Sequence, residues 1–205
     1  MDRRRPRLGI MGGTFDPPHI GHLRAAEQVR SALDLDEVLL VVANEPWQKT
    51  GSRNVTAAAH RLAMVEAAAE GLRGVRASSI EILRGGPSYM VDTLEWFVAN
   101  QPDTQLFLIV GADAAAGLDT WHRAHDLPGL ATLVVIERPG CDATASPPGW
   151  PADAPLERVP VAPVDVSSSE IRDRLRKEQR ADGLVPESVL TYVRRHALYG
   201  EDVHD

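Results

Sequence analysis

The chain has 205 residues, a length that suits one domain with at most a small appended part. Hydrophobic residues make up 43% of it, which is enough to bury a core and argues against global disorder. The net charge of −7 at pH 7 disfavours a general nucleic-acid binder, because phosphate backbones need a basic surface, but it leaves room for a local basic pocket.

A single cysteine, Cys141, excludes an intrachain disulfide and fits a reducing compartment. No apolar run approaches the length that spans a bilayer, and the amino-terminal DRRRPR lacks the apolar stretch of a signal peptide. We therefore expect a soluble, cytoplasmic protein that binds neither membrane nor nucleic acid. The sequence leaves the oligomeric state open, and a homodimer is among the arrangements that it allows.

The apolar pattern alternates between the periods of strands and helices along the chain. Strands are expected at 7–11, 37–43, 75–83, 105–111 and 132–137. Helices are expected at 20–33, at 58–70 with Thr56 as the cap, and at 88–100, 168–177 and 186–196. Two segments that contain Pro and Gly, 44–54 and 138–156, are expected to be loops.

This alternation predicts an α/β fold with an open, Rossmann-like, mostly parallel sheet and helices on both faces. The whole chain, 1–205, is expected to be a single domain whose last helices form a small part at about 166–205. Such sheets bind ligands at the carboxyl ends of their strands. The first strand–helix connection is therefore a candidate binding site.

That connection carries the stretch GGTFDPPHIGH. Gly12 and Gly13 lack a Cβ, so the backbone there can approach a ligand closely. A helix that begins near His19 presents free N–H groups and its positive dipole end, which favour an anion. His19 and His22 share one helix face, and Gly21 between them allows close packing. The pattern favours phosphate binding and charge stabilisation in phosphoryl or nucleotidyl transfer.

Other interpretations of the two histidines fit less well. A histidine pair on a helix is often part of an ordinary surface or core, but here a strand and two glycines precede it. A structural zinc site needs four ligands, and neither Cys-x-x-Cys nor His-Glu-x-x-His accompanies the pair. The dinucleotide fingerprint and the P-loop are also absent, which disfavours a dehydrogenase and a P-loop kinase.

A second polar cluster, VSSSEIR (166–172), lies far downstream. Ser167 opens an S-x-x-E capping box, which begins a helix. Ser168, Ser169 and the first N–H groups of that helix can bind phosphate oxygens, and the guanidinium of Arg172 suits the same ligand. Alone, this segment could be an ordinary helix cap. Together with the histidine motif, it predicts that both ends of the chain meet at one triphosphate site.

The two motifs resemble those of the nucleotidyltransferase superfamily that shares H-x-G-H with class I aminoacyl-tRNA synthetases. VSSSEIR is similar to its I-S-S-T-x-I-R motif, with Ser169 at the threonine position. Over nearly the whole chain, the resemblance narrows to the bacterial nicotinate-nucleotide adenylyltransferases. It rests on LDEVLLVVANEPWQK, HRLAMVEAA, GGPSYMVDTLEWF, FLIVGADAAAGLDTWHR, LVVIERPG and VPESVLTYVRRHALYG. Many members have PPHK where this chain has PWQK, so Trp47 and Gln48 could reshape the lid over the pyridine site.

The resemblance implies that nicotinate mononucleotide attacks the α-phosphate of ATP, giving nicotinate adenine dinucleotide and pyrophosphate in NAD biosynthesis. Catalytic roles are then expected for His19, His22, Lys49 and Arg172. The ATP-binding residues implied by the resemblance are Gly12, Gly13, Thr14, Phe15, His19, His22, Gly111, Asp113, Ser168, Ser169 and Arg172. Mg²⁺ is the expected cofactor, held by the ATP phosphates and water, so we expect no metal ligand from the protein.

The nicotinate end of the site is expected to involve Ser88, Tyr89, Thr93, Trp121 and Arg138. Trp121 could stack on the pyridine ring and Tyr89 could cover it, while N–H groups at the start of the 88–100 helix reach the carboxylate. Both aromatic residues could equally belong to the core, and Arg138 could equally form a surface ion pair. Three other histidines are expected to be structural: His60, His122 and His125.

Other functions stay open as alternatives. A related enzyme could use nicotinamide mononucleotide or another phosphate monoester, because backbone N–H groups alone can recognise the ring substituent. A nucleotide-binding regulator could keep the fold without turnover, but the intact motif residues disfavour this. A tRNA-binding relative of the synthetases is disfavoured by the negative charge, the short chain and the absence of a K-M-S-K-S loop.

Overall fold

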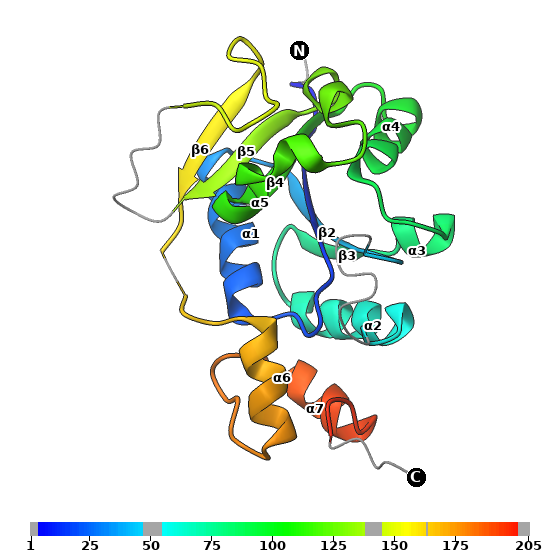
Figure 1. Cartoon of the computed structure of the whole chain (residues 1–205), viewed down its shortest axis with the longest axis vertical. Helices are drawn as coiled ribbons and strands as arrows, with labels where there is room; N and C mark the ends of the chain where they lie inside the picture. The colour runs from blue at the N-terminus through cyan, green and yellow to red at the C-terminus, as the bar shows by residue number, and fades with distance from the viewer. Residues whose placement is uncertain (1–3, 47–54, 138–144, 163, 201–205) are drawn as a thin grey trace.

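In the computed structural model, the described residues are 4–46, 55–137, 145–162 and 164–200. Their centre is a six-stranded sheet in which all neighbouring strands are parallel (Figure 1). The strands are β1 (Arg7–Gly13), β2 (Glu37–Val42), β3 (Val75–Ser78), β4 (Gln105–Gly111), β5 (Thr132–Glu137) and β6 (Leu156–Pro160). Their order, β3-β2-β1-β4-β5-β6, is that of a doubly wound Rossmann fold, so the predicted fold class is confirmed.

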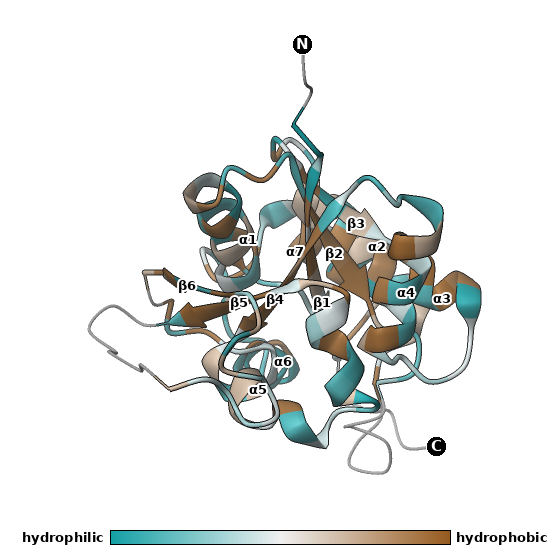
Figure 2. Cartoon of the chain, turned by 90° about the horizontal axis from the view of Figure 1, so that it is seen from above, coloured by the Kyte–Doolittle hydropathy of each residue, from teal (hydrophilic) through white to brown (hydrophobic). Residues whose placement is uncertain are grey.

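Helices cover both faces of the sheet. The sheet therefore separates the core into two clusters, one on each face. The helices are α1 (Ile20–Ala32), α2 (Ala58–Ala69), α3 (Ile80–Arg84), α4 (Met90–Asn100), α5 (Ala112–Ala116), η2 (Leu118–Thr120), η3 (Ala124–Gly129), α6 (Ser168–Arg176) and α7 (Glu187–Arg195). One cluster contains Val29 of α1 and Met64 of α2, and the other contains Leu94 of α4 and Leu127 of η3. Figure 2 shows the apolar strands between these helical layers.

The continuous apolar run of β2 follows from burial on both faces. Val38 and Leu40 belong to the cluster under α1 and α2, whereas Leu39 and Val41 belong to the cluster under α4. All four side chains are buried. Full burial of each such side chain contributes about 1.5–3 kcal/mol, so the central strands are a major source of stability.

One expected strand was too long, and one strand of the sheet was not expected. The expected strand at 75–83 ends at Ser78, where its pairing with Val41 of β2 also ends, and the chain continues as the short helix α3. Gly85 terminates that helix with a φ of 73°, a conformation that suits glycine. The strand β6 was not expected. It is an edge strand that pairs only with β5 within the described part of the chain, so its side chains lack the strong apolar signal of a central strand.

The expected cap at Thr56 also differs from the structure. The N-cap residue of α2 is Ala57, and it makes no side-chain cap bond. Thr56 instead accepts a hydrogen bond at its backbone oxygen from Nε of Arg61, at 2.7 Å. A buried guanidinium therefore binds the start of this helix, where a capping hydroxyl was expected.

The sheet topology places the ligand site. The chain passes from β1 outward through β2 and β3, and then returns to the other side of β1 with β4. A crevice forms at such a reversal beyond the carboxyl ends of the strands. In Figure 1, α6 and α7 lie beyond that end of β1, next to the start of α1. Segments far apart in the sequence therefore meet where the fold predicts a ligand.

Candidate active site

A cavity of about 330 Å³ lies at the carboxyl ends of β1 and β4. Its wall combines the glycine-rich stretch after β1, the end of β4, the segment before α4, and the start of α6. The lining residues are Met11, Gly12, Gly13, Thr14, Phe15, Asp16, His22, Ala43, Pro46, Glu81, Ser88, Met90, Leu108, Ile109, Val110, Gly111, Ala114, Trp121 and Ser168. His22 and Ser168 share this cavity, so the expected meeting of the two motifs is found.

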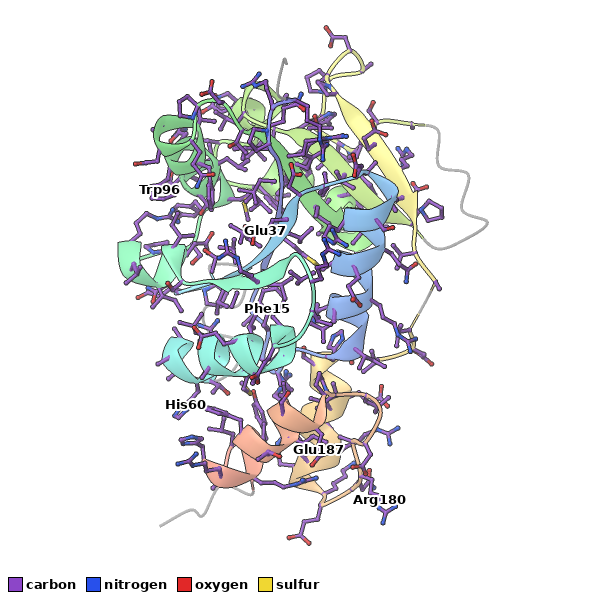
Figure 3. All side chains as sticks on the ribbon, turned by 180° about the vertical axis from the view of Figure 1, so that it is seen from behind. Phe15, Glu37, His60, Trp96, Arg180 and Glu187 are labelled. Atoms are coloured by element: carbon purple, nitrogen blue, oxygen red, sulfur yellow. The ribbon has the colours of Figure 1, made fainter. Side chains whose placement is uncertain are left out.

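The turn between β1 and α1, residues 14–18, is tightly shaped; we call it the motif turn. Phe15 adopts a left-handed φ of 50°, and the bond between Asp16 and Pro17 is cis. A Cβ on Gly13 would come within 2.8 Å of the Phe15 ring, so only glycine fits there without moving that ring. Phe15 is buried and meets His22 edge-on, with ring centroids 5.0 Å apart. In Figure 3, Phe15 lies in the interior of the molecule.

The two motif histidines have different positions. His22 lines the cavity, whereas His19 is buried behind it, with the two rings stacked at 3.7 Å. Burial lowers the pKa of His19 to about 4, so this ring is neutral at pH 7. The backbone N–H of His19 donates to Nδ1 of His22 at 3.2 Å. Because Nδ1 accepts this bond, the ring proton of neutral His22 resides on Nε2.

The N–H groups at the start of α1 are less available than the sequence predicted. The N–H of Ile20 donates to the backbone oxygen of Leu184 at 3.0 Å, and the N–H of His22 donates to the oxygen of His19 at 3.0 Å. Gly21 does provide close packing, as expected. A Cβ there would lie 3.0 Å from Nδ1 of His19 and 3.3 Å from the Val166 side chain. The packing partners are thus the neighbouring imidazole and the second motif.

Side chains of the second motif donate hydrogen bonds to the backbone of the motif turn. The hydroxyl of Ser168 donates to the backbone oxygen of Pro17 at 2.9 Å. Arg172 is buried and donates to the backbone oxygen of Asp16 at 2.7 Å and to Oγ of Ser169 at 2.9 Å. Arg172 and Ser169 do not belong to the cavity lining, although direct phosphate contacts were expected from both. In this geometry, the Arg172 guanidinium supports the turn.

The helix cap of the second motif is present. Ser167 is the N-cap residue of α6, and its hydroxyl accepts a hydrogen bond from the N–H of Glu170 at 3.1 Å. The Glu170 carboxylate accepts from Arg174, one turn further along, at 2.8 Å. Loss of such a serine cap typically costs about 1 kcal/mol. The cap therefore fixes where α6 begins and directs Ser168 toward the cavity.

A buried arginine that the sequence pattern did not single out lies behind the motif turn. Arg61 of α2 is 1% exposed and donates to the backbone oxygens of Thr14 at 2.9 Å, Asn44 at 2.9 Å and Thr56 at 2.7 Å. Burial lowers its pKa, and the charge of Asp16 opposes that shift. The sequence did contain a signal, because Arg61 is spaced by three and four residues from Met64 and Val65 on the buried face of the helix.

The residues expected at the ribose and pyridine end separate into two groups. Gly111, Ser88 and Trp121 line the cavity. Asp113 is exposed and outside that lining, and Tyr89 stacks on His122 with ring centroids 4.1 Å apart. Thr93 is fully buried and donates its hydroxyl proton to the carboxylate of Glu81 at 2.7 Å. The Thr93 side chain is thus used within the protein.

Glu81 is a cavity residue that the sequence did not reveal. It was assigned to a strand, but it lies on α3 and is 3% exposed. Burial raises the pKa of its carboxyl group, while the hydroxyls of Thr93 and Ser88 and the charge of Arg84 counteract this effect. A buried carboxyl group at the same wall as Ser88 and Trp121 gives this end of the cavity an acceptor.

Some expected site residues lie outside the described part of the chain, namely Lys49 and Arg138 in addition to Trp47 and Gln48. His60 bonds Tyr192 through Nδ1 at 3.0 Å, and His125 lies on the surface near Asp126. Among the described residues, no three side chains of His, Cys, Asp or Glu gather as a metal site. No helix of the described ranges is long and apolar enough to cross a membrane.

The chain matches a family model and several known proteins over most of its length. Residues 10–174 match the cytidylyltransferase-like family model. A probable nicotinate-nucleotide adenylyltransferase of Leifsonia xyli is 41% identical over 97% of this chain and 96% of its own length. One of Bacillus pumilus is 39% identical over 94% of this chain and 98% of its own length.

A solved structure has the same fold. The Plasmodium falciparum nicotinic acid mononucleotide adenylyltransferase complexed with NaAD superposes with a TM-score of 0.76 at 18% sequence identity. That match covers 95% of this chain and 97% of the other. The H-x-G-H turn at the carboxyl end of β1 and the serine-rich start of α6 therefore occur in a chain related along its length to the two bacterial proteins named above. The chain belongs to the cytidylyltransferase-like family, within which its relatives are the bacterial nicotinate-nucleotide adenylyltransferases.

Proposed function

We propose that this chain transfers the adenylyl group of ATP to nicotinate mononucleotide, giving nicotinate adenine dinucleotide and pyrophosphate in NAD biosynthesis. The observation that carries the proposal is that one cavity is lined by His22 of the first motif, Ser168 of the second, and Trp121 from the segment after η2. The relatives at 39–41% identity carry the name of this activity. Together they favour a site that accepts two nucleotides end to end.

The reaction needs positioning and charge stabilisation more than it needs a base. The phosphate of the mononucleotide is already a nucleophile, so its oxygen attacks the α-phosphorus and the bond to pyrophosphate breaks. The site must hold two anions together and stabilise the charge that develops on the departing group. Nε2–H of His22 is the donor that we assign to the α-phosphate, because Nδ1 is already committed to the backbone of His19.

The other phosphate contacts follow from the cavity wall. Backbone N–H groups of Thr14 and Phe15 would face phosphate oxygens. The Ser168 hydroxyl would reach the β- and γ-phosphates by exchanging its bond to the backbone oxygen of Pro17 for one to phosphate. His19 would act through His22, since its ring is buried and neutral behind that residue. Lys49 is assigned to charge neutralisation on the basis of the family resemblance. Arg172 supports the turn at the backbone of Asp16.

Mg²⁺ would enter with the triphosphate and would neutralise its charge while keeping most of its waters. The donor set fits this role. Two carboxyl side chains belong to the described cavity lining, those of Asp16 and Glu81, and each accepts a hydrogen bond from a protein hydroxyl. Both carboxyl groups are thus already engaged within the protein, and we assign the metal to the phosphates and water.

The nicotinate ring is assigned to the wall formed by Ser88 and Trp121. Trp121 offers a ring face for stacking. Tyr89 would cover the ring only after leaving its stack on His122. The acid or amide group of the ring would meet the segment that precedes α4, where Ser88 accepts from the N–H of Asn44 at 2.8 Å. This segment is where selection between the two mononucleotides would occur.

Purified protein with ATP, Mg²⁺ and either nicotinate or nicotinamide mononucleotide tests the proposal through pyrophosphate release. We expect release with the acid substrate and much slower release with the amide. His22→Ala should lower kcat by about 10²–10³-fold, because an oriented donor to developing charge is removed. Release with neither mononucleotide would reject the enzyme assignment. Release with the amide alone would reject the acid preference.

A further inference from the structure

Asp16 lies at the centre of the motif turn, and its side chain has a partner from the far end of the chain. The residue is 1% exposed. The hydroxyl of Tyr199 donates to Oδ1 of Asp16 at 2.7 Å, and the N–H of Thr56 donates to Oδ2 at 3.5 Å. Residue 16 and residue 199 are thus joined by a short, charge-assisted hydrogen bond, the stronger class of such bonds.

The backbone conformation of the chain after α7 places the Tyr199 hydroxyl at Asp16. Tyr199 has a left-handed φ of 63°, and the N–H of Leu198 donates to the backbone oxygen of Val193 at 3.0 Å. The Tyr199 hydroxyl also lies 3.8 Å from the sulfur of Met64 on α2. A non-glycine residue in this conformation costs free energy and persists where the surrounding structure enforces it.

The hydroxyl stays a donor over the physiological pH range. Burial raises the pKa of Tyr199, and the negative charge of Asp16 raises it further. The Arg61 guanidinium, whose pKa responds to the charge of Asp16, donates to the backbone oxygen of Thr14, two residues before Asp16. Tyr199 and Arg61 therefore hold the motif turn at two points, and neither residue lines the cavity.

We propose that Tyr199 is a positioning residue for adenylyl transfer, whose hydroxyl fixes Asp16 and through it the motif turn that orients His22. The inference rests on the proposed function. Its physical basis is that small displacements of a group that contacts the transferring phosphate cost large factors in rate. The hydroxyl itself touches no substrate, so its loss should change the geometry of the turn and leave the cavity wall chemically intact.

Tyr199→Phe removes this single oxygen and keeps the ring. We expect kcat/KM for ATP to fall about tenfold, which corresponds to about 1.4 kcal/mol. Tyr192→Phe is the matched control. Its hydroxyl also makes a hydrogen bond to a residue far away in the sequence, Nδ1 of His60 on α2 at 3.0 Å, but that bond does not involve the motif turn. The control should keep kcat/KM within about twofold, since it removes an ordinary hydrogen bond remote from the cavity.

A double-variant cycle separates positioning from general stability. With Asp16→Ala as the second change, Tyr199→Phe should cause little additional loss of activity, because each change removes one partner of the same hydrogen bond. Melting temperatures and calorimetric ATP binding are measured for each protein. Wild-type kcat/KM in Tyr199→Phe would overturn the inference, as would equal losses in both tyrosine variants or a lowered melting temperature with unchanged kcat/KM.

The ATP-binding measurement also distinguishes failure of the inference from failure of the proposed function. If the unsubstituted protein releases no pyrophosphate with either mononucleotide, the proposed function fails. The inference about the turn then stands if Tyr199→Phe still weakens ATP binding about tenfold relative to Tyr192→Phe. Equal ATP affinity in the two tyrosine variants, or no ATP binding by the unsubstituted protein, would overturn it in that case.

Discussion

Replacing Arg61 by methionine is the sharpest test of what holds the motif turn in place. The guanidinium donates to three buried backbone oxygens and sits near the buried charge of Asp16. Hydrogen bonds that involve a charged group contribute about 1.5–3 kcal/mol each. Because the three bonds act as one network, we expect a total loss of about 4–6 kcal/mol, a large part of the about 5–15 kcal/mol that stabilises a typical domain.

Urea unfolding followed by circular dichroism measures this loss as a lower midpoint at unchanged slope. Arg61→Lys keeps the charge but cannot reach all three oxygens, so it should recover about half of the stability. Arg76→Met is the control, since Arg76 is an exposed partner of Glu37, and it should cost at most about 1 kcal/mol. A variant Arg61→Met that does not fold agrees with the prediction. A loss no larger than that of the control would refute it.

Two further variants test residues that flank the motif turn, His19 and Gly13. The pKa of His19 is about 4 in the folded protein, below its ordinary value of 6.5, so the unfolded chain binds more protons between these values. Stability should therefore fall by up to about 3 kcal/mol as the pH falls from 6.5 to 4, and the pH profile of His19→Asn should be flatter; parallel unfolding profiles would contradict this. Gly13→Ala should lower kcat/KM by about tenfold or more, because its Cβ would come within 2.8 Å of Phe15, whose ring contacts His22. Gly117→Ala, whose Cβ would meet nothing closer than 3.9 Å, is the matched control, and equal activity of the two alanine variants would exclude this effect.

The sequence by itself determined the fold class and the two motifs. The central strands are buried on both faces, so their apolar runs are continuous, and α1 shows its period at Leu23, Ala26 and Val29. The S-x-x-E pattern located the start of α6, where Ser167 is the N-cap residue. These signals depend only on residues close together in the sequence, so the sequence alone is enough to predict them.

Only the tertiary structure decided how the motif residues divide their roles in space. The sequence pattern does not distinguish His19 from His22. In the folded chain the two rings are stacked, with His19 buried and His22 lining the cavity. Arg172 was expected to reach phosphate directly, whereas packing against the turn directs its guanidinium to the backbone of Asp16. A side chain's direction depends on neighbours from other segments, and no spacing in the sequence records them.

Sequence analysis likewise missed Arg61, Glu81 and Tyr199, although each is now placed in or behind the site. Their partners lie far along the chain or on an element that was assigned wrongly, as with Glu81. Local pattern thus determined that a phosphate-binding turn follows β1. The long-range hydrogen bonds of a folded chain decided which side chains hold that turn, because a buried polar group must find its partner wherever the fold supplies one.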